Sequence, residues 1–169
     1  KLSSEYLDII KKPRYGYGKN MNPCMDCKIF MLNKSAEYMK ENDAHFLVTG
    51  EVLGQRPMSQ RFDSFKIIER DTGLEGIIVR PLSAKLLPPS IPEKNGWIKR
   101  EELLDIKNRS RKKQFELAEK LNIKKFLSPS GGCLLTDPEF SKRIKDLLTY
   151  NKNFDLNDVH LLKLGRHFR

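Results

Sequence analysis

The sequence predicts an α/β fold in which helices pack in layers against a small sheet. Two short apolar runs, at 44–50 and 75–82, have the composition of buried strands, and a segment with helical periodicity lies between them. Hydrophobic residues make up 38% of the 169 residues, which is enough for a sizeable core. Alternation of strand and helix is typical of layered α/β domains.

The predicted sheet is too small to be complete, because two strands alone do not make a stable open sheet. The chain begins at Lys1 rather than at a methionine, and its last motif, "LLKLGRHFR", has no closing cap or polar tail. We therefore expect a piece of a longer protein, in which the sheet is incomplete on the N-terminal side.

Helices and a loop are expected around the first strand. Apolar residues at helical spacing predict helices over 2–12 and 27–41, while prolines and glycines predict a loop over 13–23. After the strand, a helix is predicted over 61–73, with Gly73 as its C-cap.

After the second strand, the prolines of 83–97 predict an extended connector. Helices are predicted over 99–107 and 110–122. A turn-rich segment follows, and Asp137 is expected to cap a further helix that has Pro138 at its first position.

The segment "NKN" at 151–153 has the composition of a linker. The sequence therefore predicts two domains, a main α/β domain over 1–150 and the beginning of a small unit over 151–169; that this unit binds RNA is implied only by the family resemblance given below.

The charge of the chain points to a polyanionic partner. Its net charge is +10, from 32 Lys and Arg against 22 Asp and Glu, and the basic residues concentrate in 98–114, in 141–148 and in the final "GRHFR". A lysine-rich surface without a partner is the simpler interpretation, and RNA is the more specific one. The expected RNA contacts are Arg109, Arg111, Lys112, Lys113, Lys142 and Arg143. No apolar run approaches the roughly 18 residues of a membrane span, so no membrane partner is expected.

The three cysteines are the main chemical signal. An odd number argues against a disulfide framework and favours a reducing, cytoplasmic location. Cys27 is predicted at the start of a helix, where the helix dipole favours a thiolate, and Cys24 precedes it by three residues. Cys133 follows Gly131 and Gly132 and precedes the helix that Asp137 caps, so the three thiols are expected to meet at one end of the sheet.

The spacing alone leaves four interpretations of these cysteines open. The three sulfurs hold a [4Fe–4S] cluster with one iron left without a protein ligand. Alternatively, Cys133 carries a persulfide that Cys27 resolves through a transient disulfide. A structural zinc held with a histidine is the third interpretation, and a set of small buried residues without chemistry is the fourth.

Six motifs in order resemble a known family over nearly the whole chain. This is the family of PP-loop ATP pyrophosphatase-like proteins related to tRNA 2-thiouridine synthases, often labelled thiouridylate methyltransferases. The motifs are "NPCMDCKIFM", "FLVTGEVLGQRPMSQ", "RPLSAKLLPPSIPE", "IKNRSRKKQFELAEKLNI", "SPSGGCLLTDPEFSKRIKDLL" and "LLKLGRHFR". The resemblance implies part of a Rossmann-like layered sheet of the adenine nucleotide alpha hydrolase type.

The resemblance also has departures. The synthases carry Asn-Pro-Asp-x-x-Cys before a helix, and here Asn22, Pro23 and Cys27 match while Cys24 replaces the Asp. Their persulfide-bearing cysteine corresponds to Cys133. The change to Cys24 gives the three thiols that iron–sulfur-dependent thiolases use, so the cluster is favoured and the persulfide is the alternative. The family's pyrophosphate-binding Ser-Gly-Gly-x-Asp-Ser loop has no counterpart here, which places the binding of ATP and Mg in the longer protein.

A nucleotide-binding role is expected for the loop after the first strand. The Thr-Gly-His of the family resembles Thr49-Gly50-Glu51, and four polar residues follow it, with a solvated turn as the alternative interpretation. The expected nucleotide contacts are Thr49, Gly50, Glu51, Gln55, Arg56, Ser59 and Gln60.

The resemblance implies an enzyme component, a tRNA sulfurtransferase that adenylates a uridine carbonyl and then replaces its oxygen by sulfur. Its expected partners are tRNA and a sulfur donor, either sulfide or a cysteine desulfurase, and a homodimer is a further expectation. The rival function is a non-catalytic RNA-binding module with a structural metal. Sulfur transfer to an acceptor other than RNA is the third.

Overall fold

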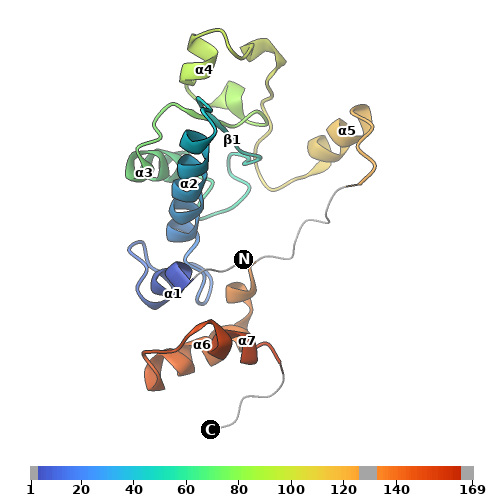
Figure 1. Ribbon diagram of the computed structural model, residues 1–169. Coiled ribbons are helices and arrows are strands. Elements are labelled where there is room, and N and C mark those ends of the chain that lie inside the picture. Colours follow the sequence, from blue (N-terminus) through green and yellow to red (C-terminus); the bar gives the residue numbers. More distant parts are fainter. Residues whose placement is uncertain (1–3, 126–132, 165–169) are drawn as a thin grey trace. The chain divides into compact units, whose positions relative to one another are not determined.

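The computed structural model describes residues 4–125 and 133–164 of the chain (Figure 1). The chain divides into two compact units, one made of 1–27 with 127–169 and the other of 28–126. We call the first the cysteine unit, because it contains Cys24, Cys27 and Cys133, and the second the sheet unit. The predicted domain boundary after residue 150 is a different division, and it stays a prediction.

The sheet unit contains two parallel strands joined through a helix. Strand β1 (Leu47–Val48) pairs with β2 (Ile78–Val79), with Leu47 opposite Ile78 and Val48 opposite Val79. Between them runs α3 (Phe62–Thr72), and Gly73 ends this helix in the left-handed conformation, as predicted. The chain is therefore rich in helix with a small parallel sheet, which confirms the predicted α/β class at this level.

The second half of the sheet unit differs from the prediction. The expected extended connector contains the 3-10 turn η1 (Ala84–Leu86) and α4 (Ile91–Lys94). Helix α4 forms because the Ser90 side chain accepts from the backbone of Glu93 while the Glu93 carboxylate accepts from the backbone of Ser90, which is a capping box.

The helix predicted over 99–107 is wrong. Only η2 (Arg100–Glu102) is helical there, because the following backbone donates to distant carbonyls: Leu104 to Pro81 at 2.8 Å and Ile106 to Leu82 at 2.7 Å. The next helix, predicted over 110–122, is present as α5 (Lys112–Lys120).

The cysteine unit consists of helices and turns. It contains α1 (Ser4–Lys11), η3 (Leu134–Thr136), α6 (Pro138–Tyr150) and α7 (Leu156–Leu161). The Asp137 carboxylate accepts from the Phe140 N–H at 2.7 Å, which confirms the predicted cap of α6. The core of this unit is built from apolar residues of these helices and of the segment between α6 and α7, namely Leu7, Ile10, Phe140, Ile144, Phe154 and Val159.

Helix α2 (Cys24–Glu41) starts three residues before the predicted position. Pro23 is buried directly before it, and the Cys27 N–H donates to the Pro23 carbonyl at 2.8 Å. Both Cys24 and Cys27 therefore lie in the first turn of the helix, instead of one in a loop and one in a helix. Among the helices that the structure describes, none combines the length and apolarity needed to cross a membrane.

Candidate functional site

Two hydrogen bonds within the cysteine unit bring Cys133 to the segment that leads into α2. The Met21 N–H donates to the Leu135 carbonyl at 3.1 Å, and the Asn20 side-chain amide donates to the Thr136 carbonyl at 2.8 Å. Cys133 occupies the N-cap position of η3, two residues before Leu135 and three before Thr136. The loop before α2 is thus hydrogen-bonded to η3, which is remote from it in the sequence and directly follows Cys133.

The first turn of α2 is also hydrogen-bonded to the beginning of this loop. The Asp26 carboxylate accepts from the backbone N–H of Arg14 at 2.8 Å and from that of Tyr15 at 3.1 Å. A carboxylate in the first turn also interacts favourably with the positive end of the helix dipole. The position of the Cys24–Cys27 turn is therefore defined by backbone contacts that do not involve the thiols.

Tyr6 connects the three thiols. Its side chain is buried in α1, and it is hydrogen-bonded to Cys27. Burial is the largest cause that raises the pKa of the Tyr6 hydroxyl, followed by the bond to Cys27 and by the charges of Cys27, Cys133 and Cys24. A hydrogen bond that raises the pKa of an acid is one that the acid donates, so the hydroxyl donates to the Cys27 sulfur. All three thiols consequently lie near one phenol.

The cysteines differ in access to solvent. Cys24 and Cys27 are half-buried, whereas Cys133 is exposed. The pKa of the Cys133 thiol is nevertheless raised, first by loss of hydration against the protein and then by the charge of Cys27, while the Leu135 N–H acts in the opposite direction. All three cysteines are present as thiols, and the exposed one is coupled electrostatically to Cys27.

The structure leaves the expected metal centre untested. Within 4–125 and 133–164, no group of three or more His, Cys, Asp or Glu side chains is placed to hold a metal ion. The [4Fe–4S] cluster, the persulfide and the structural zinc therefore all stay predictions for these cysteines.

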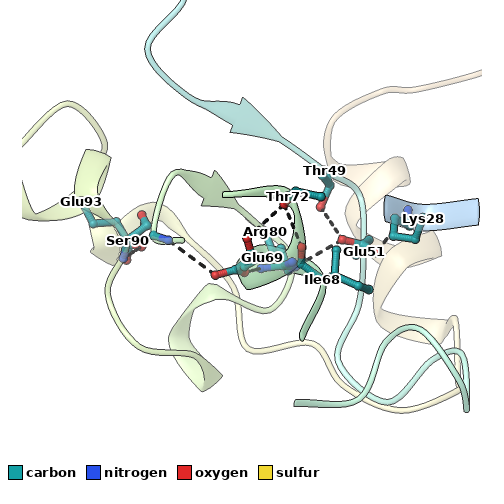
Figure 2. A network of polar contacts seen from close by, with 10 residues as sticks. Lys28, Thr49, Glu51, Ile68, Glu69, Thr72, Arg80, Ser90 and Glu93 are labelled. Carbon is teal, nitrogen blue, oxygen red and sulfur yellow. Dashed lines mark hydrogen bonds and ion pairs between the residues drawn. The ribbon is translucent and has the colours of Figure 1, made fainter. Parts of the chain in front are cut away.

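The sheet unit contains a second assembly of ionisable side chains, centred on Arg80 (Figure 2). Glu51, an expected nucleotide contact, is buried and accepts from Arg80 Nε at 3.2 Å and from the Thr49 hydroxyl at 3.1 Å. Its other oxygen lies 3.2 Å from the Lys28 ammonium. Arg80 also pairs with Glu69. Thr49 and Glu51 thereby connect the ends of β1 and β2, and their expected role in nucleotide binding stays a prediction.

The other expected nucleotide contacts form a compact loop after β1. Gly50 and Arg56 are exposed, Gln55 is half-buried and Ser59 is buried. Gln55 donates to the Gln114 side chain at 3.1 Å, which attaches this loop to the basic helix α5. A role in nucleotide binding stays a prediction for these residues and for Gln60, whose side-chain oxygen is buried without a hydrogen-bond partner in the described part of the chain.

The expected RNA contacts fall into both units. In the sheet unit, Arg109, Lys112 and Lys113 are exposed, and Lys113 pairs with Asp105 at 3.3 Å. Arg111 is half-buried at the start of α5.

In the cysteine unit, Lys142 is exposed and pairs with Glu139 at 2.8 Å. Arg143 instead donates to the Leu162 carbonyl at 2.7 Å and thereby joins α6 to α7. Gly131, Gly132 and the "GRHFR" end lie outside the described residues.

Sequence reasoning missed two central residues, Tyr6 and Arg80. Both stand within ordinary amphipathic or strand patterns that carry no motif. Arg80 follows two apolar strand residues, and its position opposite Glu51 could have been inferred only with the parallel register in hand.

Comparisons of the chain with protein-family models, with curated proteins and with solved structures find no match.

Proposed function

We propose that this chain is part of an ATP-dependent tRNA sulfurtransferase, a cytoplasmic thiouridine synthase with a PP-loop, Rossmann-like fold. One observation carries the proposal: the neighbouring Cys24 and Cys27 and the remote Cys133 lie in one unit, and the charges of all three raise the pKa of the Tyr6 hydroxyl. Buried structural cysteines have no need of such an arrangement, whereas delivery of sulfur requires neighbouring thiols of which one is accessible.

The first step of the proposed reaction is the activation of the uridine. ATP with Mg adenylates a carbonyl oxygen of a uridine and releases pyrophosphate, so the oxygen becomes part of a leaving group. The target base has to be in a loop or flipped out of its stack, because the carbonyl is not accessible within an RNA helix. Sulfur then attacks the carbon and AMP leaves with the former carbonyl oxygen.

The cysteines supply the sulfur in the second step. In the favoured form, Cys24, Cys27 and Cys133 would hold a [4Fe–4S] cluster, which when bound offers an iron without a protein ligand as a place for sulfide. Tyr6 would then orient Cys27, because its hydroxyl donates to that sulfur.

In the alternative form, Cys133 carries the sulfur as a persulfide. Its terminal sulfur attacks the activated carbon, and AMP departs. The Cys27 thiolate then attacks the Cys133 sulfur, so that the bond between the two persulfide sulfurs breaks, thiouridine leaves and a Cys27–Cys133 disulfide forms. A thiol reductant returns two electrons to this disulfide, and a cysteine desulfurase reloads Cys133. The exposure of Cys133 and its electrostatic coupling to Cys27 support this order of events.

A basic surface supports tRNA as the substrate. The exposed Arg109, Lys112 and Lys113 lie at the beginning of α5, where cations gain nothing from the helix dipole. Their expected role is to contact phosphates, and binding would therefore weaken as the salt concentration rises.

The test is to purify the chain anaerobically, reconstitute it with iron and sulfide, and measure its metal content and visible spectrum. A brown protein with absorption that is lost in Cys24→Ser, Cys27→Ser and Cys133→Ser supports the cluster. Leu134→Ser is the matched control, because it changes an exposed neighbour of Cys133 without removing a thiol.

A colourless protein is then loaded with a cysteine desulfurase and cysteine, and persulfide is measured by mass spectrometry. Persulfide on Cys133 supports the alternative form. Stoichiometric zinc with neither cluster nor persulfide would contradict sulfur transfer and leave an RNA-binding module with a structural metal.

A further inference from the structure

Asn20 has an unusual backbone conformation in the loop before α2. Its φ is 58°, in the left-handed region that residues other than glycine rarely adopt, although asparagine tolerates it better than most. Backbone bonds close this turn, from the Gly18 N–H to the Asn22 carbonyl at 2.8 Å and from the Asn22 N–H to the Lys19 carbonyl at 3.3 Å. Asn20 is exposed, so packing in a core does not explain its conformation. A residue held in a sparsely populated conformation is a candidate for a functional contact.

The Asn20 side chain makes such a contact with the turn that follows Cys133. Its amide donates to the Thr136 carbonyl at 2.8 Å, across 116 residues of sequence. The next residue adds a second bond, from the Met21 N–H to the Leu135 carbonyl at 3.1 Å. Met21 and Leu135 are both buried, whereas the Asn20 bond is exposed. We call these two bonds the η3 clamp, because they hold two consecutive carbonyls of η3.

Cys133 is attached to the same turn through its own groups. Its carbonyl accepts from the Thr136 N–H at 2.8 Å and from the Thr136 hydroxyl at 2.6 Å. Loss of hydration raises the pKa of the Cys133 thiol, and the Leu135 N–H, which donates to its sulfur, partly offsets this rise. Thr136 and Leu135 are thus bonded both to Cys133 and to the loop before α2, so a displacement of η3 moves the Cys133 sulfur with it.

The loop that forms the η3 clamp also leads directly into the turn that carries Cys27. Two buried residues, Asn22 and Pro23, separate the clamp from the first residue of α2. The Cys27 N–H donates to the Pro23 carbonyl at 2.8 Å. Short, hydrogen-bonded segments of the cysteine unit therefore run from Asn20 to both Cys27 and Cys133, and the charge of Cys27 acts on Cys133.

We propose that Asn20 is a positioning residue that holds Cys133 within reach of Cys27. The inference rests on the proposed function, because it names a residue that serves the same cysteines. The bond from the Asn20 amide to the Thr136 carbonyl is exposed, so it adds little to the stability of the fold. Its effect is on orientation, because two groups held in place react with each other far more readily than two groups that move freely.

Glycine at position 20 separates the two roles of this residue, because it keeps the left-handed backbone and removes only the side-chain amide. The test measures the equilibrium between the Cys27–Cys133 disulfide and glutathione in the full chain carrying Cys24→Ser. The two thiols give two electrons and two protons to oxidised glutathione, which becomes two molecules of reduced glutathione. We expect Asn20→Gly to lower the equilibrium constant for disulfide formation by about tenfold, which raises the reduction potential by about 30 mV.

Asn122→Gly is the matched control. Asn122 is also exposed and has a φ of 52°, but it follows α5 in the sheet unit. This variant should leave the equilibrium constant unchanged. Asn20→Asp keeps the size of the side chain but turns a carboxylate towards the Thr136 carbonyl, so it should lower the constant at least as much as Asn20→Gly. The midpoint of urea unfolding should stay nearly the same in Asn20→Gly, which separates positioning from a structural role.

An equal equilibrium constant in Asn20→Gly and in the parent would overturn the inference and leave Asn20 as a turn residue. A parent chain that forms no Cys27–Cys133 disulfide would overturn it as well, because the η3 clamp would then not hold the two sulfurs within reach.

The outcome is distinguishable from that of the proposed function, because the exchange with glutathione uses no iron, desulfurase or RNA. A chain that carries a cluster or a persulfide but shows no effect of Asn20→Gly contradicts only the positioning role. A tenfold effect in a chain that carries neither would leave positioned thiols without sulfur transfer.

Discussion

The cysteine unit and the sheet unit both gather ionisable side chains from remote parts of the sequence, but they place them in different surroundings. In the sheet unit, Arg80 and Glu51 are almost fully buried, and each charge has an opposite charge beside it. In the cysteine unit, Cys24 and Cys27 are half-buried and Cys133 is exposed, so like charges would face one another once the thiols ionise.

This difference separates structural groups from reactive ones. A buried, paired charge is held in one state, because releasing it into a medium of low dielectric constant is expensive. A partly exposed thiol next to another thiol can change its protonation and its bonding partner at modest cost. Glu51 has the surroundings of a structural group, and its expected nucleotide contact stays a prediction, while the sulfur chemistry of the chain is expected in the cysteine unit.

The largest predicted effect tests the structural side of the comparison. Arg80→Met keeps the length of the side chain but removes the guanidinium from the carboxylates of Glu51 and Glu69, so that only Lys28 still pairs with Glu51. We expect a loss of about 3–5 kcal/mol in the free energy of unfolding, measured by urea denaturation. Lys99→Met, which breaks an ion pair with Glu102 between two exposed side chains, should cost about 1 kcal/mol or less. Equal losses in the two variants would mean that the buried network does not stabilise the sheet unit.

A smaller effect is expected at Ser83, which is fully buried in the sheet unit. Its hydroxyl accepts from the Leu53 N–H at 2.9 Å and donates to the Ile106 carbonyl at 2.6 Å. Ser83→Ala leaves both backbone groups without this partner and should cost about 1–3 kcal/mol. Hydrogen exchange should show faster opening at Leu53, and protection equal to that of the parent chain would contradict the prediction.

In the cysteine unit, the cap of α6 gives a matched experiment. Asp137→Ala removes the carboxylate that accepts from Phe140, with an expected loss of about 1 kcal/mol. Asp137→Asn should retain most of the stability, because an amide oxygen also caps a helix. Hydrogen exchange in the first turn of α6 is the measurement, and an equal effect of both substitutions would show that charge, not capping, is what stabilises the turn.

The sequence predicted elements that depend on local signals. Helices α1, α3 and α6 follow from apolar periodicity and from caps such as Gly73 and Asp137, which act within a few residues. It failed over 99–107, because the backbone of Leu104 and Ile106 bonds to carbonyls more than twenty residues earlier, which no local pattern records.

The same distinction applies to the candidate site. We expected Cys133 to lie near Cys27 because both residues were predicted close to the N-termini of helices. These N-termini were predicted from local signals such as the cap at Asp137. Tyr6 was missed, since a tyrosine on the buried face of α1 looks like any core residue until the fold brings Cys27 to its hydroxyl.

The smallest expected effect concerns the reactive side of the comparison, the ionisation of Cys133. Its pKa is raised by partial loss of hydration against the protein and by the charge of Cys27, so less thiolate is present at neutral pH than in an ordinary thiol. Alkylation of Cys133 by iodoacetamide, followed by mass spectrometry, should therefore reach its half-maximal rate at a higher pH than alkylation of a cysteine in an unfolded peptide. Because the raised pKa means that the folded state retains a proton that the unfolded state loses, the same group makes the fold less stable as the pH rises above the ordinary thiol pKa.

Cys27→Ser removes the charge that contributes to this shift but leaves the burial of Cys133 unchanged, so the alkylation profile should move only part of the way back to lower pH. Tyr6→Phe offers the complementary change, because it removes the hydroxyl that donates to Cys27 and keeps the ring in the core. Tyr6→Phe therefore serves as a control for Cys133, because it changes the partner of Cys27 and leaves the Cys27 thiol in place. If the Cys133 profile is unchanged in Cys27→Ser, the two thiols do not interact, and the contrast between a paired sheet unit and a coupled cysteine unit is lost.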